Sequence, residues 1–241
     1  MKRIGVLGGS SDQATADYYR RLNKRVNDRL GGWNTAELLI SSMNFAFSAD
    51  CVRNDRWDAV GAYLADRAQA LERAGADLLI CVSNTLHRVA DQFTEGLRIP
   101  FLHIVDPTGE AIRRAGLTRV GLLGTKSVMA TDFLKRRYAD RFGVEIQTPT
   151  EDEQDLVDRV IFDELCRGVF SPEAKAAYLG VIDDLQRRGA QGVILGCTEI
   201  PLLVRQDDRP SFPMIDTTGL HVEAAVEFAL ADQPTSSMES G

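Results

Sequence analysis

The sequence predicts an α/β protein with two pseudo-symmetric α/β domains, each built on a parallel sheet. Short apolar segments alternate with helical stretches from one end of the chain to the other. The apolar segments are hydrophobic throughout rather than at every second residue, which is typical of strands that helices cover on both faces. Two sequence patterns also occur twice, in the same order and at nearly the same spacing, which indicates two related halves.

The hydrophobic patterns place the strands and helices in order. Strands are expected at residues 3–7, 37–41, 77–82, 101–105, 119–123, 143–147, 192–196 and 212–215. Helices are expected at residues 13–30, 56–74, 107–115, 130–142, 153–167 and 172–188. The last helix is the clearest, because four apolar residues between positions 178 and 185 share one face and Ser171-Pro172 supplies a cap and a first-turn proline. The polar residues 233–241 are expected to form a frayed end.

The internal repeat suggests how the chain divides. Residues 3–9 resemble residues 119–125, and residues 75–85 resemble residues 189–199. Either match alone could arise by chance, since strand–glycine patterns are common, but the two together favour a duplication. We expect one domain to contain residues 1–115 together with 212–241, and the second to contain residues 116–211.

Composition and charge exclude several classes of protein. The chain has 241 residues, 44% of them hydrophobic, and a net charge of −7, which argues against binding to nucleic acid or to an anionic membrane surface. Its apolar runs are too short to span a membrane, and the start of the chain reads as a buried strand rather than a leader, so a cytoplasmic protein with reduced thiols is expected. No cysteine pair has zinc-finger spacing and the three histidines lie in unrelated contexts, so no metal site is expected.

The repeat sets Ser83 opposite Cys197, each just after the end of an expected buried strand. Ligands of open α/β sheets bind outside the carboxyl ends of the strands. If the two halves face each other, these side chains approach one ligand from opposite sides. Two proton-handling groups on opposite faces of a carbon atom are what stereoinversion requires, because one removes the proton and the other returns it.

Three motifs in this order resemble the aspartate/glutamate racemase family, whose members racemise amino acids without a cofactor. The opening Gly8-Gly9-Ser10-Ser11 is similar to the start of the family pattern, residues 83–87 (Ser-Asn-Thr-Leu-His) are similar to its C-N-T-x-H motif, and residues 196–201 (Gly-Cys-Thr-Glu-Ile-Pro) are similar to its G-C-T-E-[IL] motif. The resemblance extends to about Leu230. It implies an active site in the cleft between two α/β domains, a small amino-acid substrate, no pyridoxal phosphate, no metal and a homodimer.

The sequence departs from the family pattern at Ser83, where the family usually has a cysteine. A thiol, with a reference pKa of about 8.5, can be tuned to a thiolate, whereas a serine hydroxyl is a much weaker acid. We therefore expect Cys197, as a thiolate, to take the α-proton on one face, and Ser83 to deliver or relay a proton on the other. Ser83 could alternatively cap the helix that follows it.

Further residues are expected to contact the substrate. Backbone N–H groups near Ser10, Asn84, Thr85 and Thr198 lie at strand–helix junctions, where they could hold a carboxylate and stabilise developing negative charge. Glu199 could orient the site or bind the substrate amine, or it could be a helix-start carboxylate.

The resemblance adds two segments that sort substrate side chains. Glu164 resembles a family residue that reaches the cleft, although a solvated helix face is an equal alternative. The expected loop at residues 51–53 includes Val52, and Arg53 could meet an acidic side chain there or simply be solvated.

The remaining thiols and His87 have structural explanations. Cys81 points to the same side as Ser83 and could replace the missing thiol, but a core cysteine is favoured. Cys51 and Cys166 are expected to be structural, and His87 either orients the cleft or is a buried structural residue.

These observations together favour a cofactor-independent racemase of aspartate, glutamate or a similar small amino acid. Two alternatives keep the fold. One is a decarboxylase or cis–trans isomerase of a dicarboxylate, for which Cys197 alone would suffice. The other is a binding protein that has lost the chemistry, with Ser83 as the mark of that loss.

Overall fold

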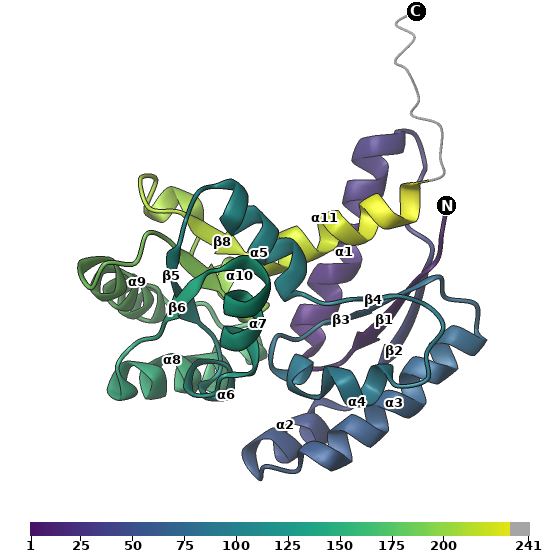
Figure 1. Ribbon diagram of the computed structural model, residues 1–241, viewed down its shortest axis with the longest axis horizontal. Helices are drawn as coiled ribbons and strands as arrows, with labels where there is room; N and C mark the ends of the chain where they lie inside the picture. Colours follow the sequence, from purple (N-terminus) through teal and green to yellow (C-terminus); the bar gives the residue numbers. More distant parts are fainter. Residues whose placement is uncertain (232–241) are drawn as a thin grey trace, which may run out of the picture.

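A computed structural model, which describes residues 1–231, contains two four-stranded parallel sheets flanked by helices (Figure 1). The predicted fold class, two α/β units with parallel-sheet cores, is confirmed. The frayed end expected at residues 233–241 lies outside the described residues.

The first sheet has the strand order β2-β1-β3-β4. Its strands are β1 (Ile4–Gly8), β2 (Leu38–Ser42), β3 (Leu78–Cys81) and β4 (Phe101–Leu102). The helices that accompany it are α1 (Asp12–Leu30), α2 (Phe45–Arg53), α3 (Trp57–Arg73), the 3-10 helix η1 (Thr85–Val89) and α4 (Ala90–Thr94). The central strands β1 and β3 are buried along their whole length, as expected for parallel strands covered on both faces.

The second sheet has the order β6-β5-β7-β8. Its strands are β5 (Arg119–Leu123), β6 (Glu145–Gln147), β7 (Val193–Leu195) and β8 (Met214–Asp216). The remaining helices are α5 (Val105–Arg114), α6 (Lys126–Ala130), α7 (Phe133–Phe142), α8 (Glu151–Asp163), η2 (Leu165–Arg167), α9 (Pro172–Arg187), α10 (Ile200–Leu203), η3 (Gln206–Asp208) and α11 (Thr217–Leu230).

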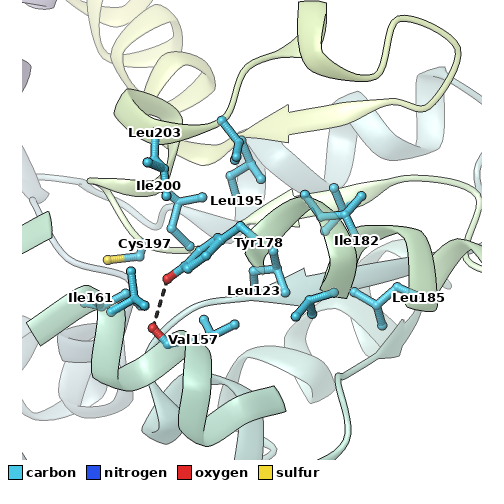
Figure 2. Close-up of a cluster of buried hydrophobic side chains, with 14 of the residues drawn as sticks. Leu123, Val157, Ile161, Tyr178, Ile182, Leu185, Leu195, Cys197, Ile200 and Leu203 are labelled. Carbon is cyan, nitrogen blue, oxygen red and sulfur yellow. Dashed lines mark hydrogen bonds between the residues drawn. The ribbon is translucent and has the colours of Figure 1, made fainter. Parts of the chain in front are cut away.

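The apolar face predicted for residues 172–188 forms the core on one side of the second sheet. Tyr178 and Ile182 of α9 are fully buried there against Leu195 of β7, and the Tyr178 hydroxyl donates a hydrogen bond of 2.9 Å to the carbonyl of Val157. Figure 2 shows this cluster, with Cys197 at its edge. The packing therefore fixes the end of β7, from which Cys197 projects.

The sequence repeat has a structural counterpart. The two sheets have the same strand order, with β1 and β3 at the centre of one and β5 and β7 at the centre of the other. The repeated residues 3–9 and 119–125 form β1 and β5, and the second repeated pattern forms β3 and β7. Consequently Ser83 and Cys197 follow the carboxyl ends of equivalent strands.

Several elements differ from the expectations. Strand β8 pairs in parallel with β7, with Met214 opposite Val193, so this part of residues 212–241 joins the second sheet. Helix α5, expected with the first domain, places Ile112 in the core of the second sheet. Helix α11 does pack with the first sheet, where it covers α1 (Figure 1). The helix expected at 130–142 begins three residues later, as α7, and the short helix α6 that precedes it was not expected.

The expected loop at residues 51–53 is instead the last turn of helix α2. The Asn44 side chain caps this helix by accepting a hydrogen bond of 3.1 Å from the backbone N–H of Ala46. Cys51 is fully buried beneath the helix, in the core of the first sheet. These two anchors explain why the segment is helical although it is short.

Candidate active site

A cavity opens between the carboxyl ends of the two sheets. The residues that line it come from the segments that follow β1, β3, β5 and β7, from α2 and from α8 with η2. Eight of the nine side chains expected at the site line this cavity, namely Ser10, Val52, Ser83, Asn84, Thr85, Cys197, Thr198 and Glu199.

The ninth, Glu164, is not among the lining residues. Its carboxylate accepts a hydrogen bond of 2.6 Å from the hydroxyl of Ser171. Ser171 in turn caps α9 by accepting from the N–H of Ala174. Glu164 therefore supports the turn between η2 and α9, and its contact with a substrate side chain stays a prediction.

Ser83 lies between β3 and η1 and is 8% exposed. Its hydroxyl accepts a hydrogen bond of 3.3 Å from the N–H of Leu86. Ser83 therefore also caps the following turn, which was the alternative role considered for it in the sequence analysis. The Ser83 carbonyl lies 2.6 Å from Nδ1 of His87. Because Nε2 of His87 accepts from the backbone N–H of Ile104 at 3.1 Å, Nδ1 carries the proton and donates to Ser83. His87 thus holds the backbone of Ser83 in place.

Cys197 follows β7 and is also 8% exposed. Its thiol donates a hydrogen bond of 3.1 Å to Oε2 of Glu199. Burial, and then the neighbouring Glu199 carboxylate, raise the pKa of the Cys197 thiol well above its ordinary value. Cys197 therefore rests as a neutral thiol, in contrast to the expected thiolate, and becomes a base only when its proton moves to another group.

Glu199, only 2% exposed, accepts from four side-chain donors among the described residues. Oε2 accepts from Cys197 and, at 2.6 Å, from the Thr198 hydroxyl. Oε1 accepts from the hydroxyl of Ser11 and lies 3.7 Å from Sγ of Cys166. A carboxylate has about four lone-pair sites, so these donors occupy its capacity. The arrangement favours the site-orienting alternative for Glu199 over direct binding of the substrate amine.

Cys166 was expected to be structural, but it also lines the cavity. It lies on η2, and burial, together with Glu199, raises the pKa of its thiol above the ordinary value. No motif marks this residue in the sequence, because it lies outside both repeated patterns. By contrast, Cys81 is fully buried, and burial raises the pKa of its thiol to about 12, in agreement with a core cysteine.

Asn84 and Thr85 link the first motif to the rest of the molecule. The Asn84 amide donates to the hydroxyl of Thr217 at 3.2 Å, while within residues 1–231 its Oδ1 atom is buried without a hydrogen-bond partner. The hydroxyls of Thr85 and Thr125 lie 2.9 Å apart and join the two sheets across the cavity. Sequence analysis missed Thr125, although the repeat sets it opposite Gly9 in the opening motif.

Ser10 lines the cavity, but its hydroxyl proton is already used in a hydrogen bond within the protein. Its Oγ donates to the carbonyl of Val82 at 2.5 Å, which ties the opening motif to the end of β3. Contact between Ser10 and a ligand would therefore have to use its backbone or a hydroxyl lone pair.

All three histidines of the chain, which the sequence suggested were unrelated, lie together behind the first motif. The rings of His103 and His221 have their centroids 4.4 and 6.2 Å from that of His87. Nε2 of His221 donates to the carbonyl of Leu102, so its Nδ1 accepts from the Tyr18 hydroxyl at 2.9 Å. Among the described residues, no group of His, Cys, Asp or Glu side chains is arranged to hold a metal ion.

Within the same part of the chain, no helix combines the length and the hydrophobicity needed to cross a membrane.

Comparison with known proteins identifies relatives of this chain and its fold. Residues 4–225 match the family described as Asp/Glu/hydantoin racemase. The structure is similar to that of a candidate Asp/Glu racemase from Yersinia pestis, with a TM-score of 0.87, 38% identity and coverage of 95% of this chain and 100% of the other. It is also similar to an aspartate racemase homologue from Pyrococcus horikoshii OT3, with a TM-score of 0.80, 33% identity and coverage of 95% and 99%.

A glutamate racemase from Roseiflexus sp. (strain RS-1) is 31% identical over 151 residues, which correspond to 62% of this chain and 54% of that protein.

Proposed function

The chain belongs to the Asp/Glu/hydantoin racemase family, and on this premise we propose that it is an amino-acid racemase that needs no cofactor and uses Cys197 and Ser83 as its proton-transfer pair. The observation that supports this proposal most strongly is that both side chains line one cavity and follow the carboxyl ends of equivalent strands. The substrate proposed from the family resemblance is aspartate, glutamate or a similar small amino acid. The homodimer that the resemblance implies and the cytoplasmic location expected from the sequence belong to the same proposal.

The proposed reaction begins with transfer of the Cys197 thiol proton to Glu199, along their hydrogen bond. The resulting thiolate removes the α-proton on one face of the substrate and becomes a thiol again. The Ser83 hydroxyl then gives its proton to the α-carbon on the opposite face and is reprotonated by water. The proton stored on Glu199 neutralises the hydroxide left by that water, so the site returns to its initial charge.

Two contacts would orient the substrate for this reaction. The unpartnered Oδ1 of Asn84 is a hydrogen-bond acceptor and is suited to the α-ammonium group. The hydroxyls of Thr85 and Thr125 form one hydrogen bond with each other, so one of their two protons is left to donate, and it is suited to the α-carboxylate, where negative charge grows as the proton leaves.

The test is incubation of the purified protein with each common L- and D-amino acid in heavy water. Deuterium at the α-carbon is scored by NMR and the enantiomers are separated by chiral chromatography. We expect deuterium uptake together with formation of the opposite enantiomer, and loss of both in Cys197→Ala.

Other products would identify the alternatives. Loss of carbon dioxide or a shifted double bond would identify the dicarboxylate chemistry. Ligand-induced thermal stabilisation that persists in Cys197→Ala, with no deuterium in any ligand, would identify a binding protein and contradict the proposal.

A further inference from the structure

One wall of the cavity is apolar and is formed by two helices, one that packs against the first sheet and one that packs against the second. Helix α2 contributes Phe45, Ala49 and Val52, which are spaced to share one helix face, and α8 contributes Ile161 and Phe162. The rings of Phe45 and Phe162 stack across the gap, with centroids 6.4 Å apart and planes within 5° of parallel.

The polar side chain within this wall is not available to a ligand as a donor. Ser48, on the same face of α2, lines the cavity and is 3% exposed. Its hydroxyl donates to the carbonyl of Phe45 at 3.1 Å. The wall therefore presents to the bound substrate carbon atoms and one hydroxyl whose proton is already used in a hydrogen bond within the helix.

The cavity also lacks a cation for an acidic side chain. None of the described residues that line it is a lysine or an arginine. Arg53, next to Val52 along α2, is exposed, and its guanidinium carbon lies 4.8 Å from the centroid of the Phe162 ring. It stacks on the wall instead of lining the cavity. The carboxyl group that does line the cavity, Glu199, would repel a second carboxylate.

Burial of a carboxylate against apolar groups without a cation or a donor is strongly unfavourable, whereas burial of an aliphatic group there is favourable. We infer that this wall is the side-chain subsite of the enzyme, and that it selects neutral α-amino acids with aliphatic side chains over aspartate and glutamate. This inference rests on the proposed racemase function and narrows its substrate class.

The test compares amino acids of similar size that differ in charge. The pairs are leucine with aspartate and methionine with glutamate, and the measured quantity is kcat/KM for α-deuterium uptake. We expect the apolar member of each pair to be favoured by about ten-fold or more. Equal rates, or a preference for the acidic member, would overturn the inference while leaving the racemase function intact. Absence of uptake with every amino acid would instead overturn the proposed function.

A positive charge placed in this wall should shift the substrate preference from apolar toward acidic amino acids. Val52→Arg is expected to raise kcat/KM for aspartate or glutamate relative to its apolar partner by about ten-fold or more. Val169→Arg is the matched control, because Val169 is 49% exposed and is not a lining residue. If Val52→Arg does not fold, Val52→Ala keeps the test decisive, since it should raise KM for leucine by a larger factor than KM for aspartate. An unchanged KM for leucine in that variant would contradict the inference.

Discussion

The Sγ atom of Cys197 lies 3.1 Å from Oε2 of Glu199, and both groups are buried at the base of the cavity. The proton of the thiol thus points to a carboxylate before any substrate is bound. Burial, and then the Glu199 carboxylate, raise the pKa of the Cys197 thiol. A neutral thiol cannot remove an α-proton, and its hydrogen bond to Glu199 provides the route by which its proton can leave.

We predict that Glu199→Gln lowers kcat for racemisation by about 10²–10⁴-fold, the usual contribution of a positioned proton-transfer group. The amide has nearly the shape of the carboxylate but cannot store the thiol proton. The measurement is kcat and KM for the best substrate over a range of pH. We expect a large change in kcat with a small change in KM, and partial recovery at high pH, where hydroxide can ionise the thiol.

The matched control for this variant is Glu164→Gln, because Glu164 is also hydrogen-bonded but lies outside the cavity lining. Its kcat should stay near that of the unaltered protein. If the two glutamine variants lose equal activity, Glu199 has only a structural role.

We predict that substitution of Ser83 changes the rate of inversion without an equal change in the rate of α-proton exchange. In Ser83→Ala, Cys197 can still remove and return a proton on its own face, so deuterium should enter the starting enantiomer while formation of the opposite enantiomer falls. Ser83→Cys should instead accelerate inversion, because a thiol is a much stronger acid than a hydroxyl. NMR and chiral chromatography on the same samples measure the two processes. Equal loss of exchange and inversion in Ser83→Ala would show that Ser83 is not the second proton-transfer group.

The close approach of Gly9 to Met43 predicts a large loss of stability for Gly9→Ala. Gly9 has φ of +84°, and an added Cβ would lie 2.1 Å from the carbonyl oxygen of Met43, a backbone atom that cannot move freely. We expect a loss of about 2–4 kcal/mol in the free energy of unfolding, since strain and overpacking both contribute.

Gly180→Ala should have the opposite effect on unfolding by urea. Gly180 is exposed within α9 and has no atom within 4 Å of an added Cβ, so alanine is expected to add about 0.5–1 kcal/mol. A Gly9→Ala protein as stable as Gly180→Ala would contradict the argument.

The features predicted well from the sequence were those encoded locally. Alternating segments identified approximately all eight strands that the structure describes in residues 1–231. The repeat predicted the equivalence of Ser83 and Cys197, because duplicated strands keep duplicated ends. Cys166 and, apart from Val52, the wall of α2 were not identified as parts of a cavity. Their position depends on how the two sheets face each other, which no sequence pattern reports.

The pairing of β8 with β7 has a similar explanation. The sequence of a three-residue strand carries little information about which sheet the strand joins. The sheet to which β8 belongs is known only from its backbone pairing with β7. The histidines are the clearest case, because η1, α11 and the residue after β4 bring together three rings that are far apart in the sequence.

This histidine cluster predicts that acid destabilises the protein. Burial lowers the pKa of all three rings, to about 4 for His221 and about 2 for His103, where Arg137 and His221 also disfavour the charged form. In the unfolded chain these rings titrate near pH 6.5. As the pH falls below 6.5 the unfolded state binds protons that the folded state excludes, so the stability provided by neutral burial is lost progressively toward pH 4.

Urea unfolding at pH 7.5, 6.5 and 5.5 measures this loss. Each histidine should contribute about 1 kcal/mol of destabilisation at one pH unit below 6.5. His103→Gln removes one titrating ring at a position that is 8% exposed, and should therefore make the dependence on pH shallower by about one third of its slope. A free energy of unfolding that stays constant from pH 7.5 to 5.5, or a His103→Gln protein with the full slope, would show that protonation of this cluster is not coupled to folding.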